Sequence, residues 1–412
     1  MNKWYKVALF NLIILALLGL ILRYKINFPL EFIEQKKILH AHSHFAFNGW
    51  ISFLLQLLVL DHFTTQYQQY KNFWNRFFIA STIINYAMIF SFSIQGYSPL
   101  SIIFSTAAIF LSYIFCYKIY TDLKLSGNQL ISRKFILAAL FFLVLSSIGP
   151  FALAYIIATK NIHQYWYHNA LYFFLHFQYN GWFTFGILGL LFQKLEASAT
   201  YNRKLAIKVF TLLIISCIPS YLLTVLWYHP SYLITITNVI TVCVQTLGLF
   251  FLIIILYKNV KQTYAGLPAI CKWLYTVAIA AFFLKGILQF FSAYPDLGKL
   301  AFSFRPIIIG YLHLIFLVFV SLYLISLLAE KAIIPLAKNI SRIALILFSS
   351  AVLINEALLG IQGLSSIYYY YMPWVNMLLF INTIFILLGA VLLFIAAYKN
   401  VSPQLNYKNI KQ

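Results

Sequence analysis

The sequence predicts an all-α integral membrane protein, a bundle of twelve transmembrane helices with both termini in the cytoplasm. Three observations predict this fold: the composition, the long apolar stretches and the placement of the basic residues. Of the 412 residues, 63% are hydrophobic and 9% are charged, and the mean hydropathy is +0.86. Such values exclude a soluble globular protein and indicate a multi-pass protein of a cell membrane, which we expect to be the bacterial cytoplasmic membrane.

The apolar stretches have the length of membrane spans. A helix that crosses the hydrocarbon core of a bilayer needs about 20 mostly apolar residues. Twelve such windows lie at residues 5–23, 40–60, 75–95, 98–118, 134–158, 166–193, 204–228, 232–257, 271–293, 306–328, 342–360 and 374–398. No small-residue cleavage site follows the first window, so we interpret it as a span rather than a signal peptide. The segments between the windows are short, so we expect a single polytopic domain over residues 1–412 and no soluble domain.

The basic residues predict the orientation of the bundle. Most of the 29 Lys and Arg residues fall at the N-terminus, in the loops after even-numbered windows and in the C-terminal tail. Because cytoplasmic loops are enriched in Lys and Arg, both termini are expected in the cytoplasm. The formal net charge of +21 is then mostly a consequence of this orientation, and it also favours contact with anionic lipid. We expect the lipid bilayer, and no nucleic acid, as the partner of these charges.

In this orientation the second, sixth and tenth windows run from outside to inside, and the histidines gather near their outer ends. The segment LHAHSHFAFNGW opens the second window with His40, His42 and His44, and His313 lies about two turns into the tenth. Histidine is costly in hydrocarbon, so these side chains need a metal, a haem iron, a proton path or a hydrogen bond as partner. Their one-sided clustering indicates a haem or a metal near the outer face.

Helix geometry limits what these histidines can do together. His40 and His44 are about 40° apart around a helix axis, whereas His42 faces roughly the other way, so the three cannot ligate one centre. Snorkelling to the membrane boundary is the alternative role, which we favour for His40. His313 matches the second window in depth, as two haem ligands from different helices would, and a hydrogen bond to a carbonyl is its alternative role. Arg305, just outside the tenth window, is placed to hold haem propionates.

The sixth window carries two further candidate metal ligands, His168 and His176. They lie about 12 Å apart along a helix, so they cannot share one small metal ion and each needs its own role. The sequence HFAFNGW at 44–50 recurs as HFQYNGW at 176–182, an echo too short to predict a duplicated fold. In both copies, the Asn four residues after the His is placed to hold a ring nitrogen.

Two ionisable residues stand in the outer halves of other windows, Lys285 in the ninth and Glu356 in the eleventh. Opposite charges in a membrane normally pair, so we predict a structural ion pair between them. A proton relay and a clamp on haem propionates are the functional alternatives.

These features resemble subunit I of the haem-copper oxidases, and most closely its cbb-type and nitric-oxide-reductase-like branch. The resemblance rests on twelve spans, the HAHSHFAFNGW segment, WYHN in the sixth window and the histidine of the tenth. It implies a low-spin haem b whose axial ligands are His313 and one of His42 or His44. It also implies that His168, which matches the family's W…HN segment, is a copper ligand.

The chain departs from that family at the copper site. The family has two adjacent histidines in its seventh helix, whereas the seventh window here has only His229 at its far end. Tyr311 stands where the family's tenth helix has the histidine of a second haem. We therefore expect one haem b, an incomplete copper site, and electron transfer or the chemistry or sensing of oxygen or nitric oxide. Such an oxidoreductase of a respiratory chain would take electrons from a quinol or a cytochrome, and it would have small partner subunits.

Two functions without a cofactor are the alternatives. The first is a small-solute transporter or channel whose path is lined by the histidines and by Lys285 and Glu356. Transporters often contain paired helix breaks, and Pro150 and Pro219 are the clear interruptions here. The second is a structural or assembly membrane protein. A haem absorption spectrum separates both from the haem protein.

Overall fold

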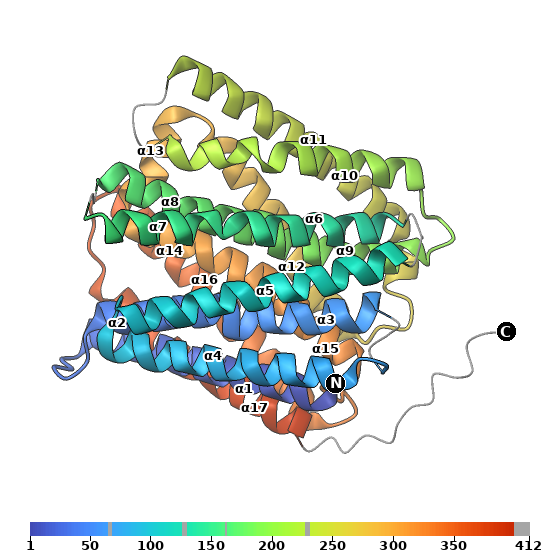
Figure 1. The fold of residues 1–412 in the computed structure, drawn as a ribbon, viewed down its shortest axis with the longest axis horizontal. Helices are drawn as coiled ribbons and strands as arrows, with labels where there is room; N and C mark the ends of the chain where they lie inside the picture. The colour runs from blue at the N-terminus through green and yellow to red at the C-terminus, as the bar shows by residue number, and fades with distance from the viewer. Residues whose placement is uncertain (65–67, 126–129, 161–162, 227–230, 399–412) are drawn as a thin grey trace.

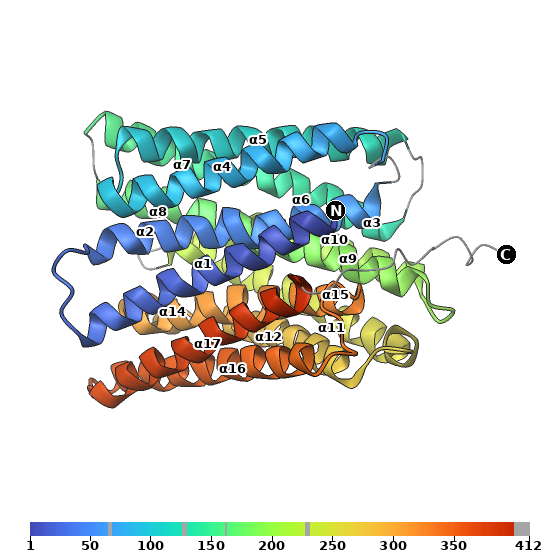
Figure 2. The same cartoon turned by 90° about the horizontal axis from the view of Figure 1, so that it is seen from below.

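Helices make up all the regular structure in the computed structural model, which describes residues 1–64, 68–125, 130–160, 163–226 and 231–398; no strand occurs within these ranges. Most of the helices lie side by side along one direction (Figure 1), and the view from below shows them stacked in several rows (Figure 2). The predicted all-α class is confirmed, and the long apolar helices agree with a membrane-spanning protein.

The helices follow the predicted windows along the chain. The first half contains α1 (Asn2–Asn27), α2 (Gln35–Phe45), η1 (Ala46–Ser52), α3 (Phe53–Phe63), α4 (Lys71–Gln95), α5 (Pro99–Leu125), α6 (Ile131–Ser146), α7 (Ile148–Ala158), α8 (Gln164–His176), η2 (Phe177–Phe183) and α9 (Thr184–Glu196). The second half contains α10 (Arg203–Cys217), η3 (Pro219–Val225), α11 (Tyr232–Thr263), α12 (Ala269–Ser292), α13 (Pro295–Ser303), α14 (Arg305–His313), η4 (Leu314–Ser321), α15 (Leu322–Glu330), α16 (Asn339–Ile367) and α17 (Pro373–Tyr398). Every predicted window overlaps one helical segment, and the short helix α13 is an addition.

Length and apolar character give fewer spans than the twelve predicted windows. Ten helical segments of the described chain are long and apolar enough to cross a membrane, or eleven if the bent pair α10 and η3 counts as one span. The bend of 41° falls at Pro219, one of the predicted interruptions. The segment Gln164–Glu196 is not among the ten, because polar side chains such as His176, Gln178 and Asn180 lower its hydropathy.

Three segments near the centre of the bundle share one kind of interruption. The segments α2–α3, α8–α9 and α14–α15 each contain a π-helical stretch. The stretches η2 and η4 begin directly after His176 and His313, and η1 begins two residues after His44. Stretches of π-helix are rare in proteins, and those that occur are often found at functional sites. We call the end of the bundle at which α2, α8 and α14 begin the histidine end; it lies on the left in Figure 1.

Side chains of the π-helical stretches join these three segments. The rings of Phe47 and Phe316, each three residues after a histidine, meet with their centroids 4.8 Å apart. Two indole N–H groups donate to serine hydroxyls of a neighbouring segment: Trp50 to Ser321 at 2.8 Å and Trp182 to Ser52 at 3.0 Å. The sequence repeat places a histidine before a π-helical stretch in α2–α3 and in α8–α9. The same arrangement occurs in α14 and η4, where the sequence repeat is absent.

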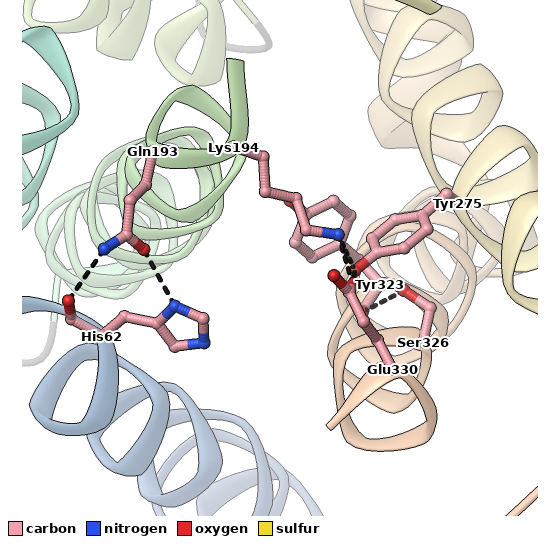
Figure 3. A network of polar contacts seen from close by, with 7 residues as sticks. All are labelled: His62, Gln193, Lys194, Tyr275, Tyr323, Ser326 and Glu330. Carbon is pink, nitrogen blue, oxygen red and sulfur yellow. Dashed lines mark hydrogen bonds and ion pairs between the residues drawn. The ribbon is translucent and has the colours of Figure 1, made fainter. Parts of the chain in front are cut away.

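Paired charges hold the opposite end of the bundle, as Figure 3 shows. Lys194 of α9 forms an ion pair with Glu330 of α15, and the hydroxyl of Tyr275 of α12 donates to the same carboxylate at 2.5 Å. His62 of α3 and Gln193 of α9 make two hydrogen bonds of 2.8 Å with each other. These contacts tie four helices together and give the ionised groups there a structural role.

The described chain begins and ends at this same opposite end. The Lys6 ammonium group of α1 donates to the carbonyl of Tyr398, the last residue of α17, at 3.3 Å. This placement agrees with an even number of membrane crossings, as a twelve-helix bundle requires.

Candidate functional site

A cavity of about 690 Å³ opens in the histidine end of the bundle. Its volume is typical of sites that hold cofactors and other small molecules. Two faces of the segment that begins with α2 line this cavity. We therefore distinguish two parts of its lining, which we call the α14 lobe and the α5 lobe. The α14 lobe includes Leu15, Gly19, Arg23, His42, Ile309 and His313, and the α5 lobe includes His44, Asn48, Asn85, Ser105, Phe151 and Gln178.

His42 enters the α14 lobe from α2 and packs against α1. A Cβ atom added at Gly19 would lie 3.3 Å from Cε1 of His42, so the glycine provides the room that the imidazole occupies. The ring contacts the backbone of Leu15, yet its Nδ1 is buried without a hydrogen bond of good geometry. The Nδ1 side of the ring therefore faces α1, and a ligand in the lobe would meet the other side of the imidazole.

His313 lines the same lobe from the end of α14. Its Nδ1 lies 2.8 Å from the carbonyl oxygen of Ile309. Because a carbonyl only accepts, Nδ1 carries the proton and Nε2 keeps its lone pair. The two imidazoles are close enough to influence each other's charge. The α14 lobe therefore has a histidine from each of two helices, and His313 offers a basic nitrogen that its own backbone contact leaves free.

Two arginines line the cavity beside these histidines, Arg23 of α1 and Arg305 at the start of α14. The charge of Arg23 acts on both His42 and His313. Within the described parts of the chain, no carboxylate forms an ion pair with either arginine. Guanidinium groups bind carboxylates and phosphates in fixed geometry, so this end of the lobe suits an anionic group of a ligand.

The other two histidines of α2 belong to the α5 lobe. The Nε2 atom of His44 lies 3.1 Å from the hydroxyl of Tyr97, and its ring stacks on Phe92 with centroids 4.2 Å apart. His40 meets the ring of Tyr97 edge to face at 4.5 Å. Burial raises the pKa of Tyr97, so its hydroxyl keeps the proton. The predicted arrangement, with His42 facing away from the other two, is confirmed.

The structure separates the two predicted metal ligands of the sixth window. His168 lines the cavity from α8 and stacks on Tyr172, with centroids 6.0 Å apart. His176 is 1% exposed, and both of its ring nitrogens are used. Asn180 donates to the Nδ1 atom of His176 at 3.0 Å, and the Nε2 atom of His176 donates to the carbonyl of Cys217 at 2.9 Å.

The role predicted for the Asn of the echo is confirmed in one copy. Asn180 holds the ring of His176, whereas Asn48 donates to the backbone carbonyl of His44 at 3.3 Å. The described chain contains no group of three or more His, Cys, Asp or Glu residues arranged to hold a metal ion. His229 lies outside the described residues.

The predicted ion pair between Lys285 and Glu356 is wrong. No such pair forms in the part of the chain that the structure describes. Lys285 is 2% exposed, and its Nζ lies 6.0 Å from the ring centroid of Tyr179 and 5.5 Å from that of Phe282. These two ring contacts place the ammonium group beside η2 and beside a residue of its own helix, α12. One carboxylate oxygen of Glu356 is buried without a hydrogen bond.

Sequence reasoning missed two residues of the α14 lobe, Gly19 and Arg23. The sequence does carry a signal for Arg23, a guanidinium at the end of the first apolar run, LLGLILRYK. Gly19 gave no local signal, because its role depends on the approach of α2.

No protein-family model matches the chain, and no curated protein matches it. Function therefore has to be inferred from the site itself.

Proposed function

We propose that the protein binds one low-spin b-type haem in the α14 lobe, with His42 and His313 as its axial ligands. The observation that carries this proposal is that imidazoles from two different helices line one lobe, and that the one hydrogen bond of His313 is made by its Nδ1 and leaves its Nε2 available. Haem iron held by two histidines requires ligands that come from opposite sides of a flat cavity.

The residues of the lobe fit a haem in three respects. The hydrogen bond from His313 to the carbonyl of Ile309 fixes the tautomer that a ligating histidine needs. Arg23 and Arg305 supply cations for the two propionates. The remaining walls are largely apolar, with side chains such as Leu15 and Ile309, as a porphyrin ring requires.

Each of these residues has a distinct task toward the haem. His42 and His313 would hold the iron, and the carbonyl of Ile309 orients the second of them. Arg23 and Arg305 would bind the propionates. A bound haem supplies a reversible one-electron centre, which suits electron transfer or the chemistry or sensing of a diatomic gas such as oxygen or nitric oxide. The electron donor would be a quinol or a cytochrome.

His176 does not fit a copper ion, and His168 is not grouped with two further His, Cys, Asp or Glu residues of the described chain. A metal at His176 would have to displace Asn180 or the carbonyl of Cys217, and the ammonium group of Lys285 would act against a second cation there. We therefore include no copper in the proposal.

The proposed topology is twelve spans with both termini in the cytoplasm. It is supported by the overlap of every predicted window with a helical segment and by the positions of the basic residues. In this orientation the histidine end, and with it the haem, lies near the outer face of the membrane.

A reduced-minus-oxidised absorption spectrum of the purified protein tests the proposal. Expression with ample haem is expected to give a Soret band and sharp α and β bands, which a bis-histidine haem produces. A colourless protein under these conditions would overturn the proposal and favour a transporter or an assembly protein.

A further inference from the structure

We infer that the α5 lobe is a water-filled half-channel that opens at the outer face and ends beyond the middle of the membrane. It would admit water and small uncharged solutes. This part of the cavity adjoins the proposed haem site, and the inference does not depend on a haem being bound.

The first observation is a polar stripe along the helix that divides the cavity. Every fourth residue from position 40 to position 56 is polar and lines the cavity: His40, His44, Asn48, Ser52 and Gln56. In a regular α-helix, residues four apart are displaced by about 40° around the axis, so such a stripe would wind steadily away. The π-helical stretch η1 turns less per residue, which displaces residues four apart in the opposite sense. The interruption of the helix therefore keeps the stripe on one face.

The second observation is that the facing walls of the lobe are also polar. The neighbouring helices contribute small hydroxyl and amide side chains to the same cavity: Ser81 and Asn85 of α4, Ser105 and Ser112 of α5, and Ser147 between α6 and α7. Neutral hydrogen-bonding groups in hydrocarbon are costly unless they have partners. Ser105 and Ser112 donate to carbonyl groups of their own helix. The lone pairs that remain on these hydroxyls can accept a hydrogen bond from water, whereas a lipid acyl chain has none to donate.

The third observation is an acceptor at the deep end of the lobe that has no donor. Gln178 of η2 lines the cavity and is 6% exposed. Its Nε2 donates to the hydroxyl of Ser146 at 2.9 Å, whereas its Oε1 has no hydrogen-bond partner. A buried acceptor of this kind in a polar cavity is a typical position for bound water.

The limits of the lobe define a half-channel. Gln35 and Tyr97 line the cavity at the histidine end. Beyond Gln56, the residues 57–60 are fully buried and none of them lines the cavity. The stripe from His40 to Gln56 is about 24 Å long at the rise of an α-helix, compared with about 30 Å for the hydrocarbon core. The path thus passes the middle of the membrane and then ends at packed leucine and valine side chains.

The charges of the cavity predict its selectivity. No Asp or Glu is present among the described residues that line the cavity, and the arginines Arg23 and Arg305 belong to the α14 lobe. The α5 lobe is therefore lined by neutral polar groups, so water and small neutral solutes would be accepted.

Cysteine accessibility tests this inference. The background variant is Cys243→Ser, because Cys243 is exposed and the other three cysteines are buried. Asn48→Cys places a thiol in the stripe, and Ser105→Cys places one on the facing wall. The matched control is Leu55→Cys, which is fully buried on the same helical segment and packs toward Gly186 of α9. The positive control is Lys36→Cys, which places a thiol at an exposed position.

Two membrane-impermeant methanethiosulfonates are applied to intact cells, one with a sulfonate group and one with a trimethylammonium group. We expect both lobe thiols to react from outside at least tenfold faster than Leu55→Cys with each of the two reagents. Labelling is expected to be the same in a His313→Ala background, so failure of the haem proposal would not affect this result.

Three outcomes would overturn the inference. The lobe thiols could remain unlabelled while Lys36→Cys reacts. They could react only with a lipid-soluble maleimide, which would show a lobe open to lipid instead of water. They could react only in inverted vesicles, which would show an opening at the cytoplasmic face. Because the two thiols lie on different helices, misfolding of one variant leaves the other as a test.

Discussion

His313 and His176 occupy equivalent positions, each directly before a π-helical stretch, yet their surroundings differ in every other respect. His313 uses one ring nitrogen to bond the carbonyl of Ile309 and lines a cavity with the other side of its ring. His176 uses both ring nitrogens, and it does not line the cavity. The comparison teaches that the position of a histidine before such a stretch does not define its chemistry. That chemistry depends on how many ring nitrogens the neighbouring groups leave without a hydrogen bond.

The largest predicted difference between the two positions is in haem content. His313→Ala removes an axial ligand, so we expect at least 90% of the Soret absorbance per protein to be lost. His176→Ala removes a structural group, so the haem should remain while the unpaired Asn180 and Cys217 carbonyl lower the free energy of unfolding by about 2–4 kcal/mol. Absorption spectra and thermal melts of the two variants check this. Equal haem loss in both would contradict the distinction.

The arginines sharpen the description of the open site. Arg23→Leu removes a cation that acts on both histidines of the α14 lobe. A charge-assisted hydrogen bond contributes about 1.5–3 kcal/mol, so we expect haem to dissociate at least tenfold more readily, measured by transfer to apomyoglobin. The control is Arg76→Leu, an exposed residue on α4 outside the cavity. Unchanged haem transfer from Arg23→Leu would show that the propionates lie elsewhere.

The ammonium group next to His176 tests whether the closed site is only structural. Lys285 is buried without an acidic partner in the described chain. Desolvation of a charge is costly, so Lys285→Met should raise the free energy of unfolding by about 1–3 kcal/mol without a change in the haem spectrum. A loss of haem or of redox activity in this variant would instead assign a function to the closed site.

The smallest predicted effect concerns the packing of α1 on α2. In Gly19→Ala, the new methyl group would lie 3.3 Å from Cε1 of His42, so the imidazole has to shift by a few tenths of an ångström. We expect haem to dissociate about threefold more readily. The matched control is Gly360→Ala in α16, where the added methyl group meets no atom within 4 Å. The comparison is made by the same transfer assay, and an effect equal to that of the control would separate Gly19 from the site.

Sequence patterns predicted those features that depend on one helix at a time. The apolar windows predicted the helices, and helical angles predicted that His42 turns away from His40 and His44. The spacing of four residues predicted the bond from Asn180 to His176. All of these follow from the geometry of a single helix, so no neighbour has to be known.

Features that depend on contacts between helices were not predictable in the same way. Charge complementarity suggested a pair of Lys285 and Glu356, but the direction of each side chain depends on the packing of α12 and α16 against their neighbours. The same limit applies to Arg23, whose position beside His42 and His313 arises where α1, α2 and α14 meet. The choice between His42 and His44 as haem ligand also required the positions of α1 and α4.

That choice gives the most direct test of the account. His42→Ala and His44→Ala are expressed with ample haem, and their reduced-minus-oxidised spectra are compared with and without added imidazole. We expect His44→Ala to keep the spectrum of the unmodified protein. His42→Ala should lose the sharp α band and regain it when imidazole enters the space left by the side chain. Loss of the band in His44→Ala, with retention in His42→Ala, would contradict the proposed pairing of His42 with His313.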